Sequence, residues 1–182
     1  MTGNYSISEI LKAGHVKRWH IVDTVKSQSL AEHQWNVALI AQELLLRVGA
    51  NDSDVSTVVG ISLTHDLHEV RDGDLPSPTK ERLRANGWLS PESQTGIAIH
   101  IPGISGEAED GAPVASGGIE IRVSAIVRLA DLIETYNWIS QYAIGRDAPN
   151  VIRDCRRRLN RFMFDLPEQL RVAAAQVCKE LK

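Results

Sequence analysis

The chain has 182 residues, of which 43% are hydrophobic and 24% are charged, and its formal net charge is −3. These values are ordinary for a globular protein, and the length predicts one domain, residues 1–182, with a core of its own. A small negative charge supplies no general attraction for nucleic acid or for an anionic membrane, so any anion site has to be local. The sequence shows neither a signal-peptide pattern nor an apolar run long enough to span a bilayer. We therefore expect a cytoplasmic protein without nucleic-acid or membrane partners.

Apolar residues recur at helical spacing through most of the chain, and this periodicity predicts an all-α fold. In chain order, the expected helices cover 6–13, 29–48, 51 or 52 to a break at 72–74, 77 or 79 to 83, 119–143, 150–164 and a last segment that opens at 166–168. Ser29 begins a capping-box sequence, and Asn51 or Asp52 suits the N-cap of the next helix. Residues 17–22 are expected to form an irregular or short extended connection.

Residues 90–118 differ from the rest of the chain because glycine, proline and acidic residues replace the apolar pattern. We expect a long loop there, and loops of such length are usually lids, contacts between subunits or disordered segments. A mobile flap is the interpretation that we favour. The two cysteines, Cys155 and Cys178, lack the spacing of metal ligands and are expected to be buried thiols.

The adjacent residues His65 and Asp66 interrupt an apolar helical pattern. An imidazole and a carboxylate are costly to bury without partners, and adjacent helical residues point about 100° apart. Both can therefore bind one ion only if that ion lies against the flank of the helix. His33 and Asp131 occupy similar positions in two other expected helices. Each residue alone would more often be an ordinary boundary residue, but bundles build metal centres from facing helices, and two imidazoles with two carboxylates suit a divalent transition metal.

The order His33, then His65-Asp66, then Asp131 resembles the metal-binding pattern of the HD phosphohydrolase superfamily. Five short segments resemble the bacterial 5′-deoxynucleotidases of that superfamily, namely 18–19, 31–33, 65–70, 73–80 and 130–134. The resemblance covers residues 5–142 and implies an HD-domain helical bundle with one long loop. Residues 18–22 are most similar to phage dATP triphosphohydrolases, which remove dATP so that 2-aminoadenine can replace adenine in the genome.

By position in these motifs, the resemblance assigns the metal ligands, which are His33, His65, Asp66 and Asp131. It assigns the two catalytic carboxylates to Glu69 and Asp74. It assigns the substrate contacts to Arg18, Trp19, Ile21, Pro78, Thr79 and Lys80. On a continuous helix, Glu69 would lie one turn after His65, from where it could orient a water molecule or pass on a proton. Zinc, cobalt or manganese would fit the ligand set, and a second ion, Mg²⁺, could accompany a triphosphate.

The chemistry of the side chains agrees with these substrate contacts. A guanidinium such as that of Arg18 binds phosphate through two parallel hydrogen bonds, and Lys80 adds a point charge. Further cationic lining for a triphosphate is available from Lys17, Arg82 and Arg84. Trp19 offers a flat apolar face for a base or a deoxyribose. Ile21 follows by two residues, so in an extended segment its side chain would lie on the same side as Trp19. The resemblance to the phage enzymes implies that a residue so placed excludes a purine with a 2-amino group.

Three functions remain open at this point. The first is a dATP triphosphohydrolase, which yields deoxyadenosine and triphosphate, and the second is a 5′-deoxynucleotidase that releases phosphate from a deoxynucleoside monophosphate. The third is a regulatory HD module that binds a nucleotide without hydrolysing it, and the complete set of ligands and carboxylates argues against this third function. A small-molecule deoxynucleotide is the expected partner in each case. Relatives in the superfamily also imply a homo-oligomer, either a dimer or a hexamer.

Overall fold

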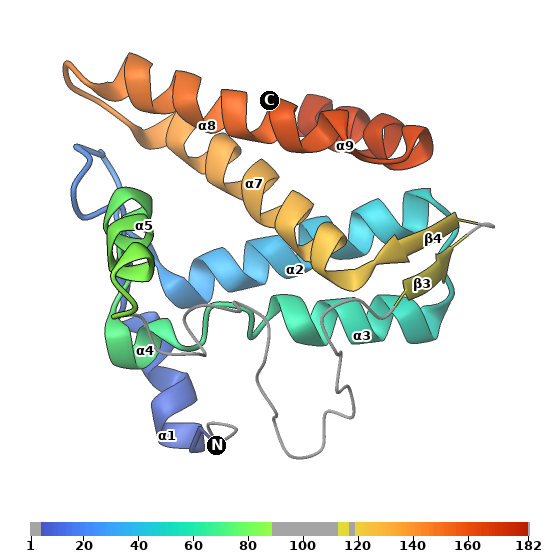
Figure 1. Cartoon of the computed structure of the whole chain (residues 1–182), viewed down its shortest axis with the longest axis horizontal. Helices are drawn as coiled ribbons and strands as arrows, with labels where there is room; N and C mark the ends of the chain where they lie inside the picture. The colour runs from blue at the N-terminus through green and yellow to red at the C-terminus, as the bar shows by residue number, and fades with distance from the viewer. Residues whose placement is uncertain (1–4, 89–112, 117–118, 182) are drawn as a thin grey trace.

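The computed structural model describes residues 5–88, 113–116 and 119–181, and helices dominate these ranges, as the periodicity predicts (Figure 1). The helices are α1 (Ile7–Ile10), α2 (Leu30–Arg47), α3 (Asp52–Ser62), α4 (Glu69–Asp72), α5 (Ser77–Ala85), α7 (Val123–Tyr142), α8 (Ala148–Phe164) and α9 (Glu168–Glu180), and a 3₁₀ helix, η1 (Leu11–Gly14), follows α1. Two short antiparallel pairs complete the fold, β1 (Lys17–Arg18) with β2 (Gln28–Ser29) and β3 (Pro113–Ser116) with β4 (Ile119–Arg122). The all-α fold class is therefore confirmed.

The core lies where α2, α3, α7 and α9 pack together, and α8 packs on α7 and contributes Leu159 to the same core. In Figure 1, α8 and α9 form the upper layer, α7 crosses beneath them, and α2 and α3 lie below α7. The fully buried side chains of the core include Leu44, Leu45, Ile126, Leu129, Ile133 and Leu170. Burying each such side chain stabilises the fold by about 1.5–3 kcal/mol, so the bundle holds its helices rigidly enough to position a site.

The expected helix starts are confirmed at two caps. The hydroxyl of Ser29 accepts a hydrogen bond from the Glu32 N–H at 3.1 Å, and α2 begins at the next residue. Asn51, one of the two candidates, caps α3 by accepting from the Asp54 N–H at 2.9 Å. These contacts satisfy N–H groups that have no partner inside their own helix.

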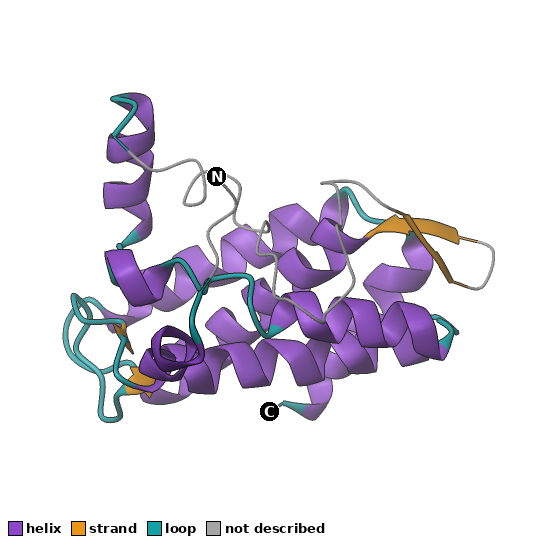
Figure 2. Cartoon of the chain, turned by 90° about the horizontal axis from the view of Figure 1, so that it is seen from below, coloured by secondary structure: helices purple, strands orange, loops and turns teal. Residues whose placement is uncertain are grey.

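One expected helix begins four residues later than its periodicity suggests. Residues 119–122 form β4, which pairs with 113–116, and α7 starts only at Val123. The alternation Ile119-Glu120-Ile121-Arg122 and the preceding pair of glycines in the sequence are hairpin signals, and they outweigh the helical period there. The prediction of a loop throughout 90–118 is thus wrong for 113–116, while 89–112 and 117–118 lie outside the described residues. The two strand pairs lie at opposite ends of the bundle (Figure 2).

The helix expected to continue from 51 or 52 to 72–74 ends early, at Ser62. Tight turns of the i to i−3 type follow, with the Thr64 N–H donating to the Ile61 carbonyl at 3.0 Å and the Leu67 N–H donating to the Thr64 carbonyl at 3.0 Å. The Thr64 hydroxyl donates to the Gly60 carbonyl at 3.1 Å. Side chains thus compete for the carbonyl groups that a continuing helix would use. His65 and Asp66 lie on this turn and not within a helix, which corrects their expected setting.

No helix within the described ranges is long and apolar enough to cross a membrane. Neither cysteine forms a disulfide; Cys155 is buried and Cys178 is half-buried.

Candidate metal and nucleotide site

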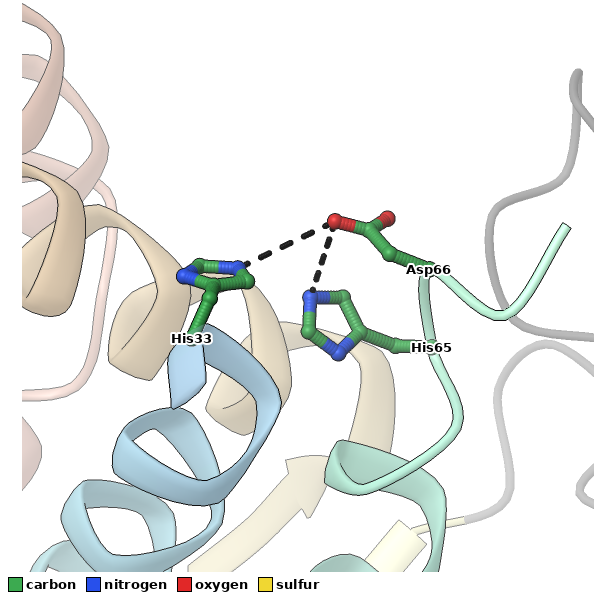
Figure 3. Close-up of side chains that lie close together, drawn as sticks. All are labelled: His33, His65 and Asp66. Atoms are coloured by element: carbon green, nitrogen blue, oxygen red, sulfur yellow. Dashed lines mark ion pairs between the residues drawn. The ribbon is translucent and has the colours of Figure 1, made fainter. Parts of the chain in front are cut away.

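Four side chains from three parts of the fold converge at one point. His33 comes from the first turn of α2, His65 and Asp66 from the turn after α3, and Asp131 from the middle of α7. Asp66 Oδ2 lies 3.8 Å from His33 Nε2 and 3.3 Å from His65 Nε2. Figure 3 shows these three side chains pointing toward one another. The fourth predicted ligand, Asp131, borders this group of three through His33, with its Oδ1 3.5 Å from His33 Nε2.

The two imidazoles are oriented by bonds from their other ring nitrogens. His33 Nδ1 lies 2.7 Å from Glu134 Oε2, and His65 Nδ1 lies 2.7 Å from the Ser62 carbonyl oxygen. Because a carbonyl oxygen only accepts, His65 Nδ1 carries the hydrogen and donates. Both Nε2 atoms are buried and have no hydrogen-bond partner among the described residues. Two inward Nε2 atoms beside two carboxylates, each imidazole held from behind, form the donor set that a divalent cation needs.

The carboxylates also create a strongly negative environment. Burial raises the pKa of Asp66, but the charges of His65 and Arg18 outweigh it and hold that pKa well below its usual range. Burial lowers the pKa of His65, while Asp66 and Asp131 overcome this effect and raise the pKa to about 9. The cluster therefore attracts positive charge strongly enough to protonate an imidazole near neutral pH. A divalent cation would take the place of that proton, because metal binding displaces protons from its ligands.

Glu69, the first residue of α4, is fully buried beside this cluster. Its Oε1 accepts a hydrogen bond from Lys80 Nζ at 2.5 Å, and its Oε2 lies 4.0 Å from a guanidinium nitrogen of Arg18. Burial and the nearby Asp66 charge raise the pKa of Glu69 to about 8, although Lys80 and Arg18 act in the opposite direction. A carboxyl with such a pKa can hold or release a proton near neutral pH, as proton transfer requires. His68, the residue before Glu69, is also buried.

A cavity of about 360 Å³ opens beside the converging ligands, and Asp66 and Asp131 form part of its wall. Five other residues expected to contact substrate or act in catalysis line it, namely Arg18, Trp19, Ile21, Asp74 and Pro78. Thr79 is not among the described residues that line this cavity, and Lys80 approaches the site through Glu69. Lys17, Arg82 and Arg84 are exposed and do not line it either, so the expected extra cationic lining is wrong for these three residues.

Further cationic lining comes instead from two arginines that lie outside the motif segments. Arg128 on α7 and Arg158 on α8 line the cavity with Arg18, and a guanidinium nitrogen of Arg128 lies 2.7 Å from Asp131 Oδ2. The signal for Arg128 was its position three residues before Asp131, which places both on one helical face. For Arg158 the sequence offered no signal, because nothing along the chain indicates that α8 packs on α7 beside the site.

Trp19 has an unusual backbone, with φ at +63°, a left-handed conformation that is an outlier for so bulky a residue. The next residues turn, and the Val22 N–H donates to the Trp19 carbonyl at 2.9 Å. The segment is therefore not extended. The expectation that strand alternation places Ile21 on the same side as Trp19 is wrong, because the chain turns there. Both side chains nonetheless line the cavity. The Trp19 ring lies parallel to that of Trp138, with centroids 6.0 Å apart.

Residues 7–85 match the family described as 5′-deoxynucleotidase YfbR-like. The chain is 29% identical over 180 residues to a dATP triphosphohydrolase of Salmonella phage PMBT28, a match that covers 95% of this chain and 86% of that protein. It is 40% identical over 72 residues to a dATP triphosphohydrolase of Cyanophage S-2L, covering 40% of this chain and 41% of that protein. Among solved structures, the fold matches the Cyanophage S-2L HD phosphohydrolase DatZ, bound to dA and one catalytic Zn²⁺ ion, with a TM-score of 0.71 and 23% identity over 97% of this chain and 95% of that one.

The fold is similar to that of an HD phosphohydrolase, and the donor set together with these matches makes metal-dependent phosphohydrolases the class of proteins that this chain most resembles. Within that class, the chain resembles the phage dATP triphosphohydrolases over nearly its whole length and the YfbR-like deoxynucleotidases over its N-terminal part.

Because Asp66 Oδ2 is the atom that approaches both inward imidazole nitrogens, we expect Asp66→Ala to lose zinc binding by at least about 10-fold in affinity. The helical far-UV circular dichroism signal should persist, because Asp66 is not part of the apolar core. Asp74→Ala is the matched control: it removes a carboxylate from the same cavity but outside the converging group, and it should keep zinc. Equal zinc affinity in Asp66→Ala and the unmodified protein would contradict the expected ligand set.

Proposed function

We propose that the protein is a dATP triphosphohydrolase, which hydrolyses dATP to deoxyadenosine and triphosphate. The observation that carries this proposal is the convergence of His33, His65, Asp66 and Asp131 at the wall of a cavity with aromatic and guanidinium lining. Support comes from the phage relatives named as dATP triphosphohydrolases and from the similar fold of a phosphohydrolase that binds dA and zinc.

In this proposal, His33, His65, Asp66 and Asp131 hold a divalent cation, with zinc, cobalt and manganese as candidates. Such a cation polarises a phosphoryl oxygen and lowers the pKa of water, so that attack on phosphorus becomes feasible near neutral pH. Arg128 Nη1 donates to Asp131, and the Thr135 hydroxyl donates to the other oxygen of Asp131 at 3.3 Å, so that carboxylate is held in one orientation.

Glu69 and Asp74 carry the proton transfers in this proposal. Glu69, with its raised pKa and its bond from Lys80, accepts a proton from the attacking water molecule. Asp74 lines the cavity directly after Gly73, whose φ of +76° turns the chain away from α4. In this proposal the Asp74 side chain assists the departure of the O5′ oxygen from phosphorus.

Three guanidinium groups in the cavity support a triphosphate over a monophosphate, and a bound cation would offset the aspartates that line the same space, which are Asp66, Asp74, Asp131 and Asp154. Three guanidinium groups, from Arg18, Arg128 and Arg158, line one space of about 360 Å³. Each can offer two parallel hydrogen bonds to phosphate oxygens, and a triphosphate has enough oxygens to use all three groups. The cavity also has apolar lining, which includes Trp19, Ile21, Val22, Leu75 and Val151. A base and a deoxyribose without a 2′-hydroxyl fit such a surface.

The second candidate function is that of a 5′-deoxynucleotidase, which the YfbR-like match over residues 7–85 favours. It would use the same residues on the same phosphorus, so the products distinguish the two functions. A regulatory module without activity would not need the buried Glu69–Lys80 pair next to the candidate ligands, and we disfavour it on that ground.

The main test is the identity of the products. We expect dATP incubated with the protein and Zn²⁺, Co²⁺ or Mn²⁺ to yield deoxyadenosine and triphosphate in equal amounts, resolved by ion-pair chromatography. Chelation of the cation should stop the reaction, and restored cation should restart it. Release of inorganic phosphate from dAMP, with dATP left intact, would replace this proposal by the deoxynucleotidase.

Glu69→Gln keeps the shape of the buried side chain but cannot take a proton from water. We expect turnover of dATP to fall by about 100-fold or more, while zinc affinity stays within a few-fold of the unmodified protein. Glu81→Gln, an exposed substitution on the adjacent helix α5, serves as the control and should change neither quantity. Loss of zinc from Glu69→Gln would show that Glu69 is a ligand and not a proton carrier.

Ile21 lies at the cavity wall although most of its side chain is exposed, at 68%. We expect Ile21→Ala to open space beside the base, so that dGTP and 2-amino-dATP become substrates while dATP turnover persists. A steric wall can reject an added group by more than the about 1–3 kcal/mol that a roomy apolar pocket provides. The measurement is the ratio of kcat/KM for dATP to that for 2-amino-dATP, and an unchanged ratio would remove Ile21 from the base pocket.

A further inference from the structure

A buried glutamine connects the two halves of the site. Gln28, in β2, is completely buried although it is polar, and both the oxygen and the nitrogen of its side-chain amide form hydrogen bonds. Its Oε1 accepts a hydrogen bond from the indole N–H of Trp19 at 3.2 Å. Its Nε2 donates to Glu134 Oε1 at 2.5 Å. A buried amide with partners for both its donor and its acceptor is held in one orientation.

On the side of the cavity, Gln28 restrains Trp19. The backbone of Gln28 pairs with Arg18 in the β1–β2 ladder, and its side chain binds the next residue, Trp19. Trp19 needs such restraint, because a left-handed backbone persists in a bulky residue only when its surroundings enforce it. The parallel ring of Trp138 supports one face of the indole, and the bond to Gln28 fixes its rotation within that plane.

On the side of the candidate ligands, Gln28 restrains Glu134. The Oε2 atom of this buried carboxyl lies 2.7 Å from His33 Nδ1, while its Oε1 accepts from Gln28. This contact fixes the orientation of the His33 ring, whose other nitrogen, Nε2, lies 3.8 Å from Asp66 Oδ2 and 3.5 Å from Asp131 Oδ1. The only other side chain in the described ranges that donates to Glu134 Oε1 is that of Asn36, at 3.3 Å.

We propose that Gln28 is a positioning residue that links the Trp19 platform for the base to the orientation of the ligand His33, so that base selectivity and cation affinity depend on one buried amide. Gln28 itself neither lines the cavity nor belongs to the converging ligands. The part of this inference that concerns base selectivity rests on the proposed function. The part that concerns cation affinity rests only on the contacts of His33, Glu134 and Gln28.

Gln28→Met tests both sides, because methionine has nearly the length of glutamine but makes neither hydrogen bond. We expect zinc affinity to fall by about 10-fold, the lower end of the loss seen when a direct partner of a ligating histidine is removed, because Gln28 acts on His33 through Glu134. Competition with a chromophoric chelator measures this affinity without turnover. We also expect the preference for deoxyadenosine over deoxyguanosine, measured by calorimetry on the zinc-loaded protein, to fall by about fivefold, the equivalent of one hydrogen bond.

Three further variants separate the two sides. Gln28→Glu keeps an acceptor for Trp19 but loses the donor to Glu134, so it should lower zinc affinity and retain base preference. This variant replaces Gln28→Met in the zinc measurement if Gln28→Met does not fold. Asn36→Ala removes the other donor to Glu134 and has no contact with Trp19, so it should affect zinc affinity alone. Gln34→Met replaces a second buried glutamine, outside this hydrogen-bonded chain, and should change neither quantity.

Zinc affinity in Gln28→Met equal to that in Gln34→Met would overturn the inference, whatever nucleotide the protein hydrolyses. A fall in zinc affinity together with an unchanged base preference would overturn the link to Trp19. If the unmodified protein shows no preference between the two nucleosides, the proposed function fails. The zinc measurements then still decide whether Gln28 positions His33.

Discussion

Two adjacent residues on a continuous helix point about 100° apart, and this angle would keep His65 and Asp66 from meeting at one point. The early end of α3 at Ser62 removes that constraint, because the following residues form tight turns. The carbonyl group freed at Ser62 then accepts from His65 Nδ1. The break in the helix therefore directs Nε2 inward as well as bringing the two side chains together, and the rest of the site depends on it.

The site then has to accommodate many charges in little space. Asp66, Asp131 and Glu134 are wholly or largely buried beside His33, and Glu69 is buried beside Asp66. Carboxylates so close together repel one another unless cations lie between them. Arg18 forms ion pairs with two of these carboxylates, at 3.4 Å from Asp66 and 4.0 Å from Glu69. Lys80 forms an ion pair with Glu69, and Arg128 forms one with Asp131. The basic residues at the site thus stabilise the folded protein in addition to any contact with phosphate, so removing one of them affects more than affinity for a ligand.

Local sequence patterns predicted the parts of this molecule that depend on neighbours along the chain. The caps at Ser29 and Asn51 and the break at Gly73 follow from such patterns, and the four converging side chains followed from rare polar positions and from a family resemblance. The missed features depend on contacts between distant segments. Gln28 meets Glu134 across 106 positions, and Arg158 reaches the cavity because α8 packs on α7, and neither contact leaves a periodic signal. The strand pair of 113–116 with 119–122 was missed for different reasons, because 119–122 also fit a helical period while 113–116 lie in a stretch whose glycines and prolines predict a loop.

The distances along the chain have a consequence for how the protein acquires its cation. His33, His65 and Asp66 leave the ribosome long before α7, which supplies Asp131 and also Glu134, the carboxylate behind His33. Until α7 packs against α2, the early residues form an incomplete and poorly oriented donor set, and contacts between such distant segments form late because loop closure opposes them. A nascent chain would therefore compete weakly for scarce transition metals. Metallation should follow the completion of folding, and the metal supply of the cell should act on the finished protein and not on its synthesis.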